Sequence, residues 1–321
     1  MKAAVLTRVR EVVMATDWPE PEPEPGQVVV ELTGVGLCGS DLAVWSGSRP
    51  VEFPWIIGHE GSGTIVSVGR GVSAARVGER VVIEPNFPCG ACPPCRRGRT
   101  SMCPRRLSLG INVPGLLRER VAIPARFAWT APDGLTDQDL VCVEPLAVAL
   151  HAARLGQAAP GARCLVVGAG SQGLLLLLAL RTMGADVAVT EPHEGRLGIA
   201  RAMGASPEAA DVPYELVFET SGSVGGTQHA LRSLAAGGTL VLIGIPHEDV
   251  PLSTASIVRG HAVVMGSIIY DHPGDFRDTL AFIARNSLSP SAVLRRTFSF
   301  ADSPAALASA VTVPGKSWIK F

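Results

Sequence analysis

A histidine and a glutamate stand side by side at His59 and Glu60, directly after the apolar segment 55–57 and Gly58. A neutral imidazole and a carboxylate are both good ligands for Zn²⁺, and one thiolate would complete a set that leaves a position open for substrate. Cys38 is the candidate thiolate. Neighbouring side chains on a regular element point to opposite sides, so His59 and Glu60 can reach one ion only where the backbone is irregular, and Gly58 permits such a bend. Taken alone, a His-Glu pair is more often a surface histidine beside a solvated carboxylate, and only the rest of the chain favours a metal site.

Four of the seven cysteines lie in the spacing C-x2-C-x2-C-x7-C. They are Cys89, Cys92, Cys95 and Cys103. The surrounding segment is rich in glycine and proline and cannot build a hydrophobic core, so four thiolates on one Zn²⁺ would supply the missing folding energy. An odd number of cysteines without an export signal disfavours a disulfide framework. An iron–sulfur cluster with a redox role is the competing interpretation, and we predict structural zinc.

A glycine-rich loop divides the chain into two halves of different texture. An apolar strand is predicted at 163–167, and an apolar helix follows the pattern G-x-G-x-x-G. The three glycines are Gly168, Gly170 and Gly173. A second strand, predicted at 186–190, ends at Glu191. This order is the dinucleotide fingerprint, in which the glycines let a pyrophosphate approach a helix N-terminus and the acid accepts hydrogen bonds from the ribose hydroxyls.

The same region indicates which nicotinamide cofactor is preferred. Glu191 repels a 2′-phosphate, which favours NAD over NADP. Arg196 follows within reach and leaves NADP possible. Ser221 and Ser267 are weaker candidates for cofactor contacts.

One further acid is a candidate ligand. Glu144 begins a predicted helix in the apolar segment 140–151, and Pro145 fits a first helical position. A buried acid among apolar neighbours needs a metal or a hydrogen-bond donor. The alternative is an acid favoured by the helix dipole at the N-terminus, and the local sequence leaves both open.

Two kinds of elements must position these residues. The first part of the chain predicts short strands with many glycines and prolines, including strands at 27–32, 63–68 and 80–83. The second part alternates strands with helices. Its strands are predicted at 216–222, 238–244 and 262–270, its apolar-faced helices at 226–235 and 275–286, and a last strand at 316–321.

Composition limits the classes of protein that fit. The 321 residues are 47% hydrophobic and 18% charged, which supplies buried cores and argues against disorder. The net charge is −1 with no basic stripe, so we expect no nucleic-acid partner. The longest very apolar run, 174–180, is too short to cross a bilayer. With no signal peptide recognised, we expect a cytoplasmic protein without membrane partners.

The motifs together resemble the zinc-dependent medium-chain dehydrogenase/reductase family, the alcohol dehydrogenase superfamily, over essentially the whole length. The family's zinc signature G-H-E-x2-G-x5-G-x2-V is met by Gly58, His59, Glu60, Gly63, Gly69 and Val72. The segment 143–151 and the Glu84-Pro85 pair resemble the sorbitol, glucose and threonine dehydrogenase branch. That resemblance implies that Cys38, His59, Glu60 and Glu144 surround catalytic zinc, directly or through water, in addition to the structural zinc.

The resemblance also implies an α/β fold with three parts. We expect a GroES-like β-rich catalytic domain at 1–143 with its zinc lobe at 89–103, a doubly wound Rossmann domain at 144–290, and a segment at 291–321 that returns to the catalytic domain. Family members are usually homodimers or homotetramers.

The implied activity is hydride transfer between NAD(H) and a small secondary alcohol or ketone, such as a polyol, cyclitol, aminocyclitol or sugar derivative, with Ser40 accepting the alcohol proton. Three features depart from the family pattern. Ala43 stands where many alcohol dehydrogenases carry a relay histidine, Ile269 where polyol-oxidising relatives often carry arginine, and the stretch 204–214 is short. The alternatives are a reductase of an activated C=C or C=N bond and, less favoured, a nucleotide sensor without turnover.

Overall fold

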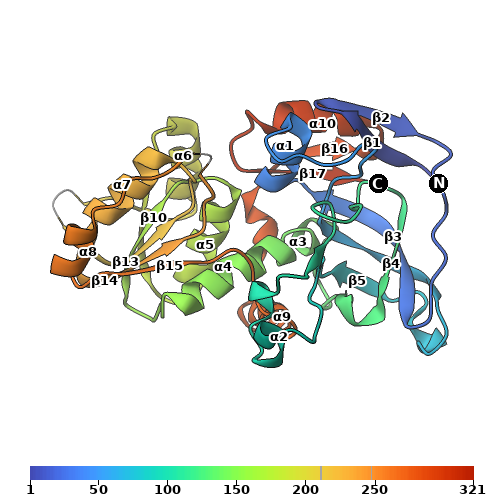
Figure 1. The fold of residues 1–321 in the computed structure, drawn as a ribbon, viewed down its shortest axis with the longest axis horizontal. Helices are drawn as coiled ribbons and strands as arrows, with labels where there is room; N and C mark the ends of the chain where they lie inside the picture. Colours follow the sequence, from blue (N-terminus) through green and yellow to red (C-terminus); the bar gives the residue numbers. More distant parts are fainter. Residues whose placement is uncertain (210–211, 247) are drawn as a thin grey trace. The chain divides into compact units, whose positions relative to one another are not determined.

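The computed structural model describes residues 1–209, 212–246 and 248–321, and the chain divides into two compact units. Unit 1 contains Met1–Glu144 and Leu280–Phe321, and unit 2 contains Pro145–Thr279. Unit 1 is rich in β-structure, whereas unit 2 is a parallel sheet with helices (Figure 1). The predicted fold class, a β-rich domain joined to a doubly wound α/β domain, is confirmed.

A seven-stranded sheet forms the centre of unit 1. Its main path runs β16-β17-β3-β4-β5-β9, and β8 also pairs with β3. The strands are β3 (Gln27–Gly36), β4 (Glu60–Val68), β5 (Arg80–Ile83), β8 (Arg120–Pro124), β9 (Ala128–Thr130), β16 (Leu294–Ser299) and β17 (Lys316–Lys320). Every pair is antiparallel except β16 with β17. Side chains such as Val30, Ile65 and Ile319 are fully buried in the core on this sheet.

Short elements complete unit 1 around that sheet. The strands are β1 (Ala3–Arg8) and β2 (Glu11–Ala15), which form a hairpin, and β6 (Asn86–Phe87) and β7 (Leu107–Ser108). The helices are α1 (Gly39–Ser46), α2 (Pro93–Arg96), α3 (Asp137–Leu140) and α10 (Ser303–Ala310). The 3₁₀ turns are η1 (Ala74–Arg76), η2 (Thr100–Met102), η3 (Ala125–Phe127), η4 (Pro290–Val293) and η5 (Phe300–Asp302).

The two ends of the chain meet in unit 1. The last strand, β17, pairs antiparallel with β3, with Trp318 opposite Gly36. The carboxylate of Asp139 accepts hydrogen bonds from the hydroxyl of Ser289 at 2.7 Å and the backbone N–H of Ser291 at 3.2 Å. The red C-terminal strands therefore lie beside the blue strands of the N-terminal half in Figure 1.

Unit 2 is built on a parallel sheet in the order β12-β11-β10-β13-β14-β15. The strands are β10 (Arg163–Val167), β11 (Asp186–Thr190), β12 (Ser206–Pro207), β13 (Tyr214–Glu219), β14 (Leu234–Leu242) and β15 (Val263–Gly266). The helices are α5 (Ser171–Thr182), α6 (Glu194–Ala202), α7 (Val224–Arg232) and α8 (Thr254–Arg259), together with α4 (Val143–Leu155) and α9 (Gly274–Asn286), which continue into unit 1. Parallel strands are buried on both faces, and Leu165, Val217 and Leu240 are accordingly 0% exposed.

Some boundaries differ from the predictions for physical reasons. The helix predicted at 226–235 ends at Arg232, because the backbone N–H of Tyr214 donates to the carbonyl of Ser233 and Leu234 already pairs in the sheet. Helix α4 begins at Val143, two residues before Pro145. The stretch that follows Gly204, which was predicted to be short, contains the two-residue strand β12 as its one regular element before β13, among the residues that the structure describes.

No helix in the described ranges is long and apolar enough to cross a bilayer.

Candidate functional site

The turn before β4 has the irregular backbone that the His-Glu pair requires. Gly58 has φ of +100°, a conformation that glycine adopts at little cost. The strand begins only at Glu60, so His59 lies outside the regular pleat. A Cβ at Gly58 would lie 3.0 Å from Val35 Cγ1, so the turn also packs closely against β3. The predicted bend is confirmed.

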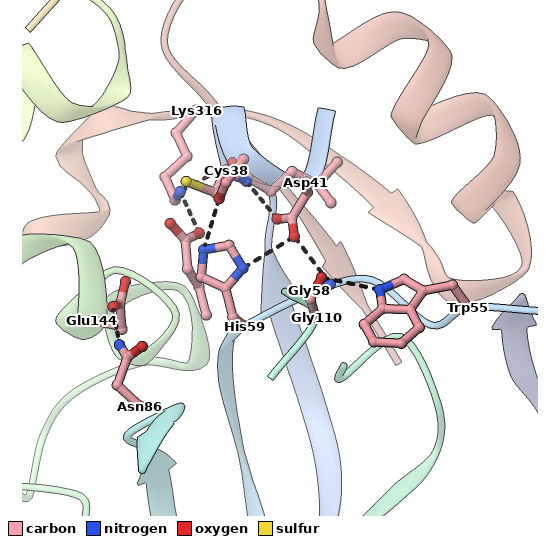
Figure 2. A network of polar contacts seen from close by, with 12 residues as sticks. Cys38, Asp41, Trp55, Gly58, His59, Asn86, Gly110, Glu144 and Lys316 are labelled. Carbon is pink, nitrogen blue, oxygen red and sulfur yellow. Dashed lines mark hydrogen bonds and ion pairs between the residues drawn. The ribbon is translucent and has the colours of Figure 1, made fainter. Parts of the chain in front are cut away.

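The bend brings two of the candidate ligands to a third from another segment. Cys38 is the N-cap residue of α1, which follows the end of β3. One ligand atom from each of Cys38, His59 and Glu60 lies within 4.8 Å of the other two. A thiolate, an imidazole and a carboxylate form a donor set suited to zinc. Figure 2 shows Cys38 and His59 in one cluster of side chains, with the nitrogen of Lys316 next to the sulfur of Cys38.

Asp41 orients the imidazole, and the sequence analysis did not identify it. Its carboxylate is fully buried on α1, and its Oδ1 lies 3.1 Å from Nδ1 of His59. An ionised carboxylate only accepts hydrogen bonds, so Nδ1 carries a proton and donates it. Nε2 is left to face Cys38 and a metal, which is the usual arrangement of a ligating histidine. The sequence did offer one sign of this role, because Asp41 lies only three residues after Cys38, in the segment Gly39-Ser40-Asp41.

Backbone donors hold Asp41 as well. The N–H of Cys38 donates to Oδ2 at 2.9 Å, and the N–H of Gly58 donates to Oδ1 at 3.1 Å. Burial would raise the pKa of Asp41, but the charge of His59 and these hydrogen bonds outweigh burial and lower it. Burial would likewise lower the pKa of His59, and the charge of Asp41 outweighs it and raises that pKa well above the usual value. The carboxylate of Asp41 therefore connects α1 to both Gly58 and His59.

Glu60 has a buried carboxylate that a cation would complete. The residue is 1% exposed, and its Oε1 has no hydrogen-bond partner within the described ranges. A buried carboxylate oxygen without a partner is costly. Its Oε2 forms an ion pair with Nζ of Lys316, a second residue that sequence analysis missed. A buried carboxylate with an unpartnered oxygen, in one group with Cys38 and His59, fits a metal ion.

Ser40 lies next to the same group. Its hydroxyl oxygen is 3.4 Å from Nε2 of His59. The hydroxyl can accept or donate a proton. Its position on α1, two residues after Cys38, agrees with the predicted proton-accepting role, which stays a prediction.

Glu144 lies beside this group rather than within it. It is 5% exposed on the first turn of α4, and Nδ2 of Asn86 lies 3.5 Å from its Oε1. Figure 2 shows the two residues together, with Glu144 from α4 and Asn86 from β6. The three-residue group of ligand atoms does not include Glu144. Its role as a zinc ligand, directly or through water, stays a prediction.

The four cysteines of the lobe form a second candidate metal centre. The sulfurs of Cys89, Cys92, Cys95 and Cys103 lie within 4.8 Å of one another. Cys92 Sγ is 3.3 Å from Cys95 Sγ and 3.8 Å from Cys103 Sγ. Tetrahedral zinc with Zn–S bonds of about 2.3 Å separates its sulfurs by about 3.8 Å.

Thiolate formation is favoured at one side of this lobe. Backbone N–H groups of Ala91 and Cys92 are the largest influences that lower the pKa of Cys89 to about 6. The guanidinium of Arg105 also donates to its sulfur at 3.4 Å. The sequence analysis did not identify Arg105.

The glycine loop of unit 2 has the predicted strand–turn–helix context. Gly168 follows β10 with φ of +101°, and Gly170 is the N-cap residue of α5. A Cβ at Gly173 would collide with the carbonyl oxygen of Gly168 and would lie 2.8 Å from Thr220 Oγ1. The third glycine therefore allows α5 to pack closely against the turn.

Glu191 lies at the end of β11 and already binds the loop. Its Oε2 accepts from the N–H of Ala169 at 2.9 Å, and its Oε1 accepts from the N–H of His193 at 3.0 Å. Arg196 is on α6, where its backbone N–H donates to Nδ1 of His193 at 3.3 Å. Each carboxylate oxygen retains a second lone pair for a ribose hydroxyl.

The two serines differ in their surroundings. The hydroxyl of Ser221 donates to Glu219, a fully buried acid that also accepts from the N–H groups of Ser221 and Gly222. Ser267 is 6% exposed, and its hydroxyl has no partner among the residues the structure describes. Of the two, Ser267 therefore has the hydroxyl that remains available for a ligand.

Comparisons with known proteins agree with this organisation. The alcohol dehydrogenase GroES-like domain model matches residues 24–133, and the zinc-binding dehydrogenase model matches residues 172–285. Sorbitol dehydrogenase of Bacillus subtilis (strain 168) is 31% identical over 306 residues, which cover 88% of this chain and 86% of that protein. The chain belongs to the zinc-dependent medium-chain dehydrogenase/reductase family.

Two solved structures extend the similarity to the whole fold. An alcohol dehydrogenase of Escherichia coli CFT073, complexed with NADH, is 26% identical with a TM-score of 0.91, covering 100% of this chain and 99% of that chain. A zinc-binding dehydrogenase of Sinorhizobium meliloti 1021, bound to NADP, is 26% identical with a TM-score of 0.92 over the same shares. The chain is therefore an NAD(P)-dependent oxidoreductase of the alcohol dehydrogenase type, as the motifs predicted.

Proposed function

We propose that this protein oxidises a secondary alcohol, or reduces the corresponding ketone, with catalytic zinc held by Cys38, His59 and Glu60 and with NAD as cofactor. The observation that carries the proposal is the meeting of these three ligand atoms within 4.8 Å. The buried Oε1 of Glu60, which has no partner in the described chain, supports it. Glu144 is proposed to take part directly or through water.

The residues of unit 1 prepare the site for the reaction. Zinc, when bound, supplies a Lewis acid that makes a coordinated hydroxyl more acidic, and the nicotinamide cofactor supplies the hydride acceptor. Asp41 fixes the tautomer of His59 so that Nε2 is free for the metal. Ser40 is proposed to accept the alcohol proton, and the distance of 3.4 Å between its hydroxyl and that nitrogen supports this role.

A relay beyond Ser40 must use another route than in many relatives. Position 43, on α1, carries alanine. A relay from Ser40 would therefore pass through the cofactor ribose or water. The loss of a relay histidine also favours the second candidate, a reductase of an activated C=C or C=N bond.

We propose a second, structural zinc in the cysteine lobe, giving two ions per chain. The sulfur separations of 3.3 and 3.8 Å around Cys92 support tetrahedral thiolate coordination. All four lobe sulfurs belong to one group, so a tetrahedral ion bound there would have no coordination position left for a substrate. This zinc would stabilise the lobe and take no part in hydride transfer.

For the cofactor, NAD is proposed as the preferred form and NADP as possible. The carboxylate of Glu191 faces the glycine loop, where it would accept from ribose hydroxyls and repel a 2′-phosphate. Gly168, Gly170 and Gly173 would admit the pyrophosphate. Arg196 on α6, Ser221 and Ser267 are proposed as further contacts, of which Ser267 has the available hydroxyl.

The proposed substrate is a polyol, a cyclitol or aminocyclitol, or a sugar-derived secondary alcohol. Similarity to the Bacillus subtilis sorbitol dehydrogenase supports this class. Ile269 replaces an arginine often found in polyol-oxidising relatives, so a cyclic polyol is a better first test than sorbitol itself.

We propose that the chain forms homodimers or homotetramers. Strand β15 is the last strand of the sheet in unit 2, and an open strand edge is a template for pairing. Val263 on this strand is 46% exposed and Ile268 just beyond it is 57% exposed. Light scattering of wild type and Val263→Lys tests this surface, and an unchanged mass in the variant would move the interface elsewhere.

The activity is tested with a panel of secondary alcohols, including cyclic polyols, under NAD⁺ and NADP⁺ in parallel. Wild type is expected to reduce NAD⁺ faster than NADP⁺. Cys38→Ser is expected to abolish turnover while binding of NADH, followed by fluorescence, is retained. Turnover retained in Cys38→Ser would remove zinc from the reaction, and activity only with unsaturated substrates and NAD(P)H would favour the reductase.

A further inference from the structure

The most deeply buried ion pair of unit 1 joins the start of β4, next to His59, to the C-terminal strand β17. Glu60, the first residue of β4, and Lys316, the first residue of β17, each have side chains only 1% exposed. Nζ of Lys316 is paired with Oε2 of Glu60 and also donates to the carbonyl of Leu37 at 3.1 Å. Figure 2 shows Lys316 reaching the group around Cys38.

Stability alone does not explain this pair. Taking two charges out of water is expensive, and replacing a buried ion pair with apolar side chains is often neutral or stabilising. The neighbouring backbone nevertheless leaves space for the ion pair. A Cβ at Gly36 would overlap Oε2 of Glu60 and lie 3.1 Å from Cε of Lys316, so a larger residue on β3 would displace the pair.

The two oxygens of Glu60 have different surroundings. Oε2 faces the ammonium group, whereas Oε1 has no hydrogen-bond partner in the described chain. A ligand atom of Glu60 lies within 4.8 Å of those of Cys38 and His59. The ammonium group and a metal would therefore compete for the same carboxylate.

We propose that Lys316 is a positioning residue that restrains Glu60 and weakens its hold on the catalytic metal. The inference rests on the proposed function, because it takes the ion at Cys38, His59 and Glu60 as given. Cys38 and Glu60 would offer two negative charges to a divalent ion, enough to neutralise it. The positive charge of Lys316 offsets one of them, so the ion keeps a net charge with which to polarise a ligand.

The test is metal affinity, measured without turnover. Wild type, Lys316→Gln, Glu60→Gln and the double variant are loaded with Co²⁺, and a chelator is titrated while the thiolate–cobalt absorption is followed. The Cys38 site is defined as the cobalt signal that Cys38→Ser removes. Glutamine keeps a donor for Leu37 but removes the charge, and Lys320→Gln, an exposed lysine on the same strand, is the matched control.

Lys316→Gln is expected to raise the affinity of the Cys38 site about tenfold, which corresponds to about 1.4 kcal/mol. It is also expected to shift the cobalt d–d bands, because Glu60 becomes free to bind more closely. Lys320→Gln leaves both unchanged. In the Glu60→Gln background, the effect of Lys316→Gln is expected to disappear.

Unchanged or lower affinity in Lys316→Gln, or the same rise without Glu60, would overturn the inference while leaving the proposed function intact. Absence of a Cys38-dependent metal in wild type would instead remove both. If Lys316→Gln does not fold, Lys316→Arg decides: it keeps the charge and is expected to keep the wild-type affinity, and an affinity raised about tenfold would contradict the charge mechanism.

Discussion

The imidazole of His59 donates from Nδ1 to Oδ1 of Asp41 at 3.1 Å, and this fully buried carboxylate also accepts from the backbone of Cys38 and Gly58. One side chain therefore sets the direction of one proposed metal ligand and the backbone position of a second. Metal sites depend on such supporting hydrogen bonds almost as much as on the ligands themselves.

Asp41→Asn is expected to lower the affinity of the catalytic metal site by about 10–100-fold. The amide can offer only one oxygen, and its NH₂ group would face a donor instead of an acceptor. Chelator competition measures the effect, with Asp17→Asn, an exposed acid in the same unit, as the control. Wild-type affinity in Asp41→Asn would show that the hydrogen bond does not support the site.

The glycine loop offers a matched pair of substitutions. Gly173→Ala is expected to cost about 1–3 kcal/mol of stability, because the new methyl group would collide with the carbonyl of Gly168. At Gly170, a Cβ meets nothing within 4 Å and the backbone has an ordinary φ of −71°. Gly170→Ala should therefore unfold like wild type.

Cofactor binding separates these two effects. Gly170→Ala is expected to weaken NADH binding despite its normal stability, because a pyrophosphate must approach the backbone at this position. NADH titration followed by fluorescence, together with thermal unfolding, measures both quantities. Wild-type NADH affinity in Gly170→Ala would place the pyrophosphate elsewhere.

Removing one ligand of the cysteine lobe is expected to destabilise unit 1. Cys103→Ser leaves three thiols for one ion, and loss of a structural metal belongs to the few changes that cost about 4 kcal/mol or more. Wild type treated with a strong chelator should show the same loss. A variant that unfolds at the wild-type temperature would contradict a structural role for zinc in the lobe.

Acid should weaken one interaction of unit 2 in a defined direction. The carboxylate of Asp275 binds Nδ1 of His151 at 2.5 Å, Arg154 at 2.5 Å and the N–H of Asp271 at 2.7 Å. Burial would raise the pKa of Asp275, but the hydrogen bonds from His151 and Asp271 and the charge of Arg154 outweigh it and lower that pKa.

A lowered pKa of a carboxyl group stabilises the folded state above its unfolded pKa of about 3.9. That stabilisation is lost as the pH falls through the folded pKa. Asp275→Asn is therefore expected to cost about 1 kcal/mol at pH 7, a value reduced for solvent screening, and nothing at pH values below the folded pKa. Denaturant unfolding across pH measures it, with Asp278→Asn as the more exposed control. A cost that is the same at low pH would exclude the ionic origin.

Local spacing was sufficient to predict much of the site. The bend at Gly58, the pairing of His59 with Glu60, and the glycine loop all follow from motifs whose members lie close in sequence, and Cys38 was added to them as the candidate thiolate. The predicted strand at 80–83 coincides with β5, and that at 316–321 with β17 apart from Phe321. In each case the residue types required by the local backbone are visible in the sequence itself.

Residues that act through distant partners could not be found in that way. Lys316 carries no local sign of a partner, because its contact with Glu60 exists only once β17 pairs with β3. In the sequence, Glu219 looks like any other residue of a strand. The backbone N–H of Ser221 that donates to its carboxylate is brought close only by the folded turn. The end of α7 at Arg232 was set by sheet pairing of Leu234, which overrode the helical pattern.

The metal content of the purified full chain tests the proposed chemistry most directly. Elemental analysis is expected to find two zinc ions per chain in wild type and one in Cys38→Ser, with NADH binding retained in both. One zinc per chain in wild type and the same single zinc in Cys38→Ser would confine the metal to the cysteine lobe. That result would contradict a zinc-dependent reaction at Cys38, His59 and Glu60.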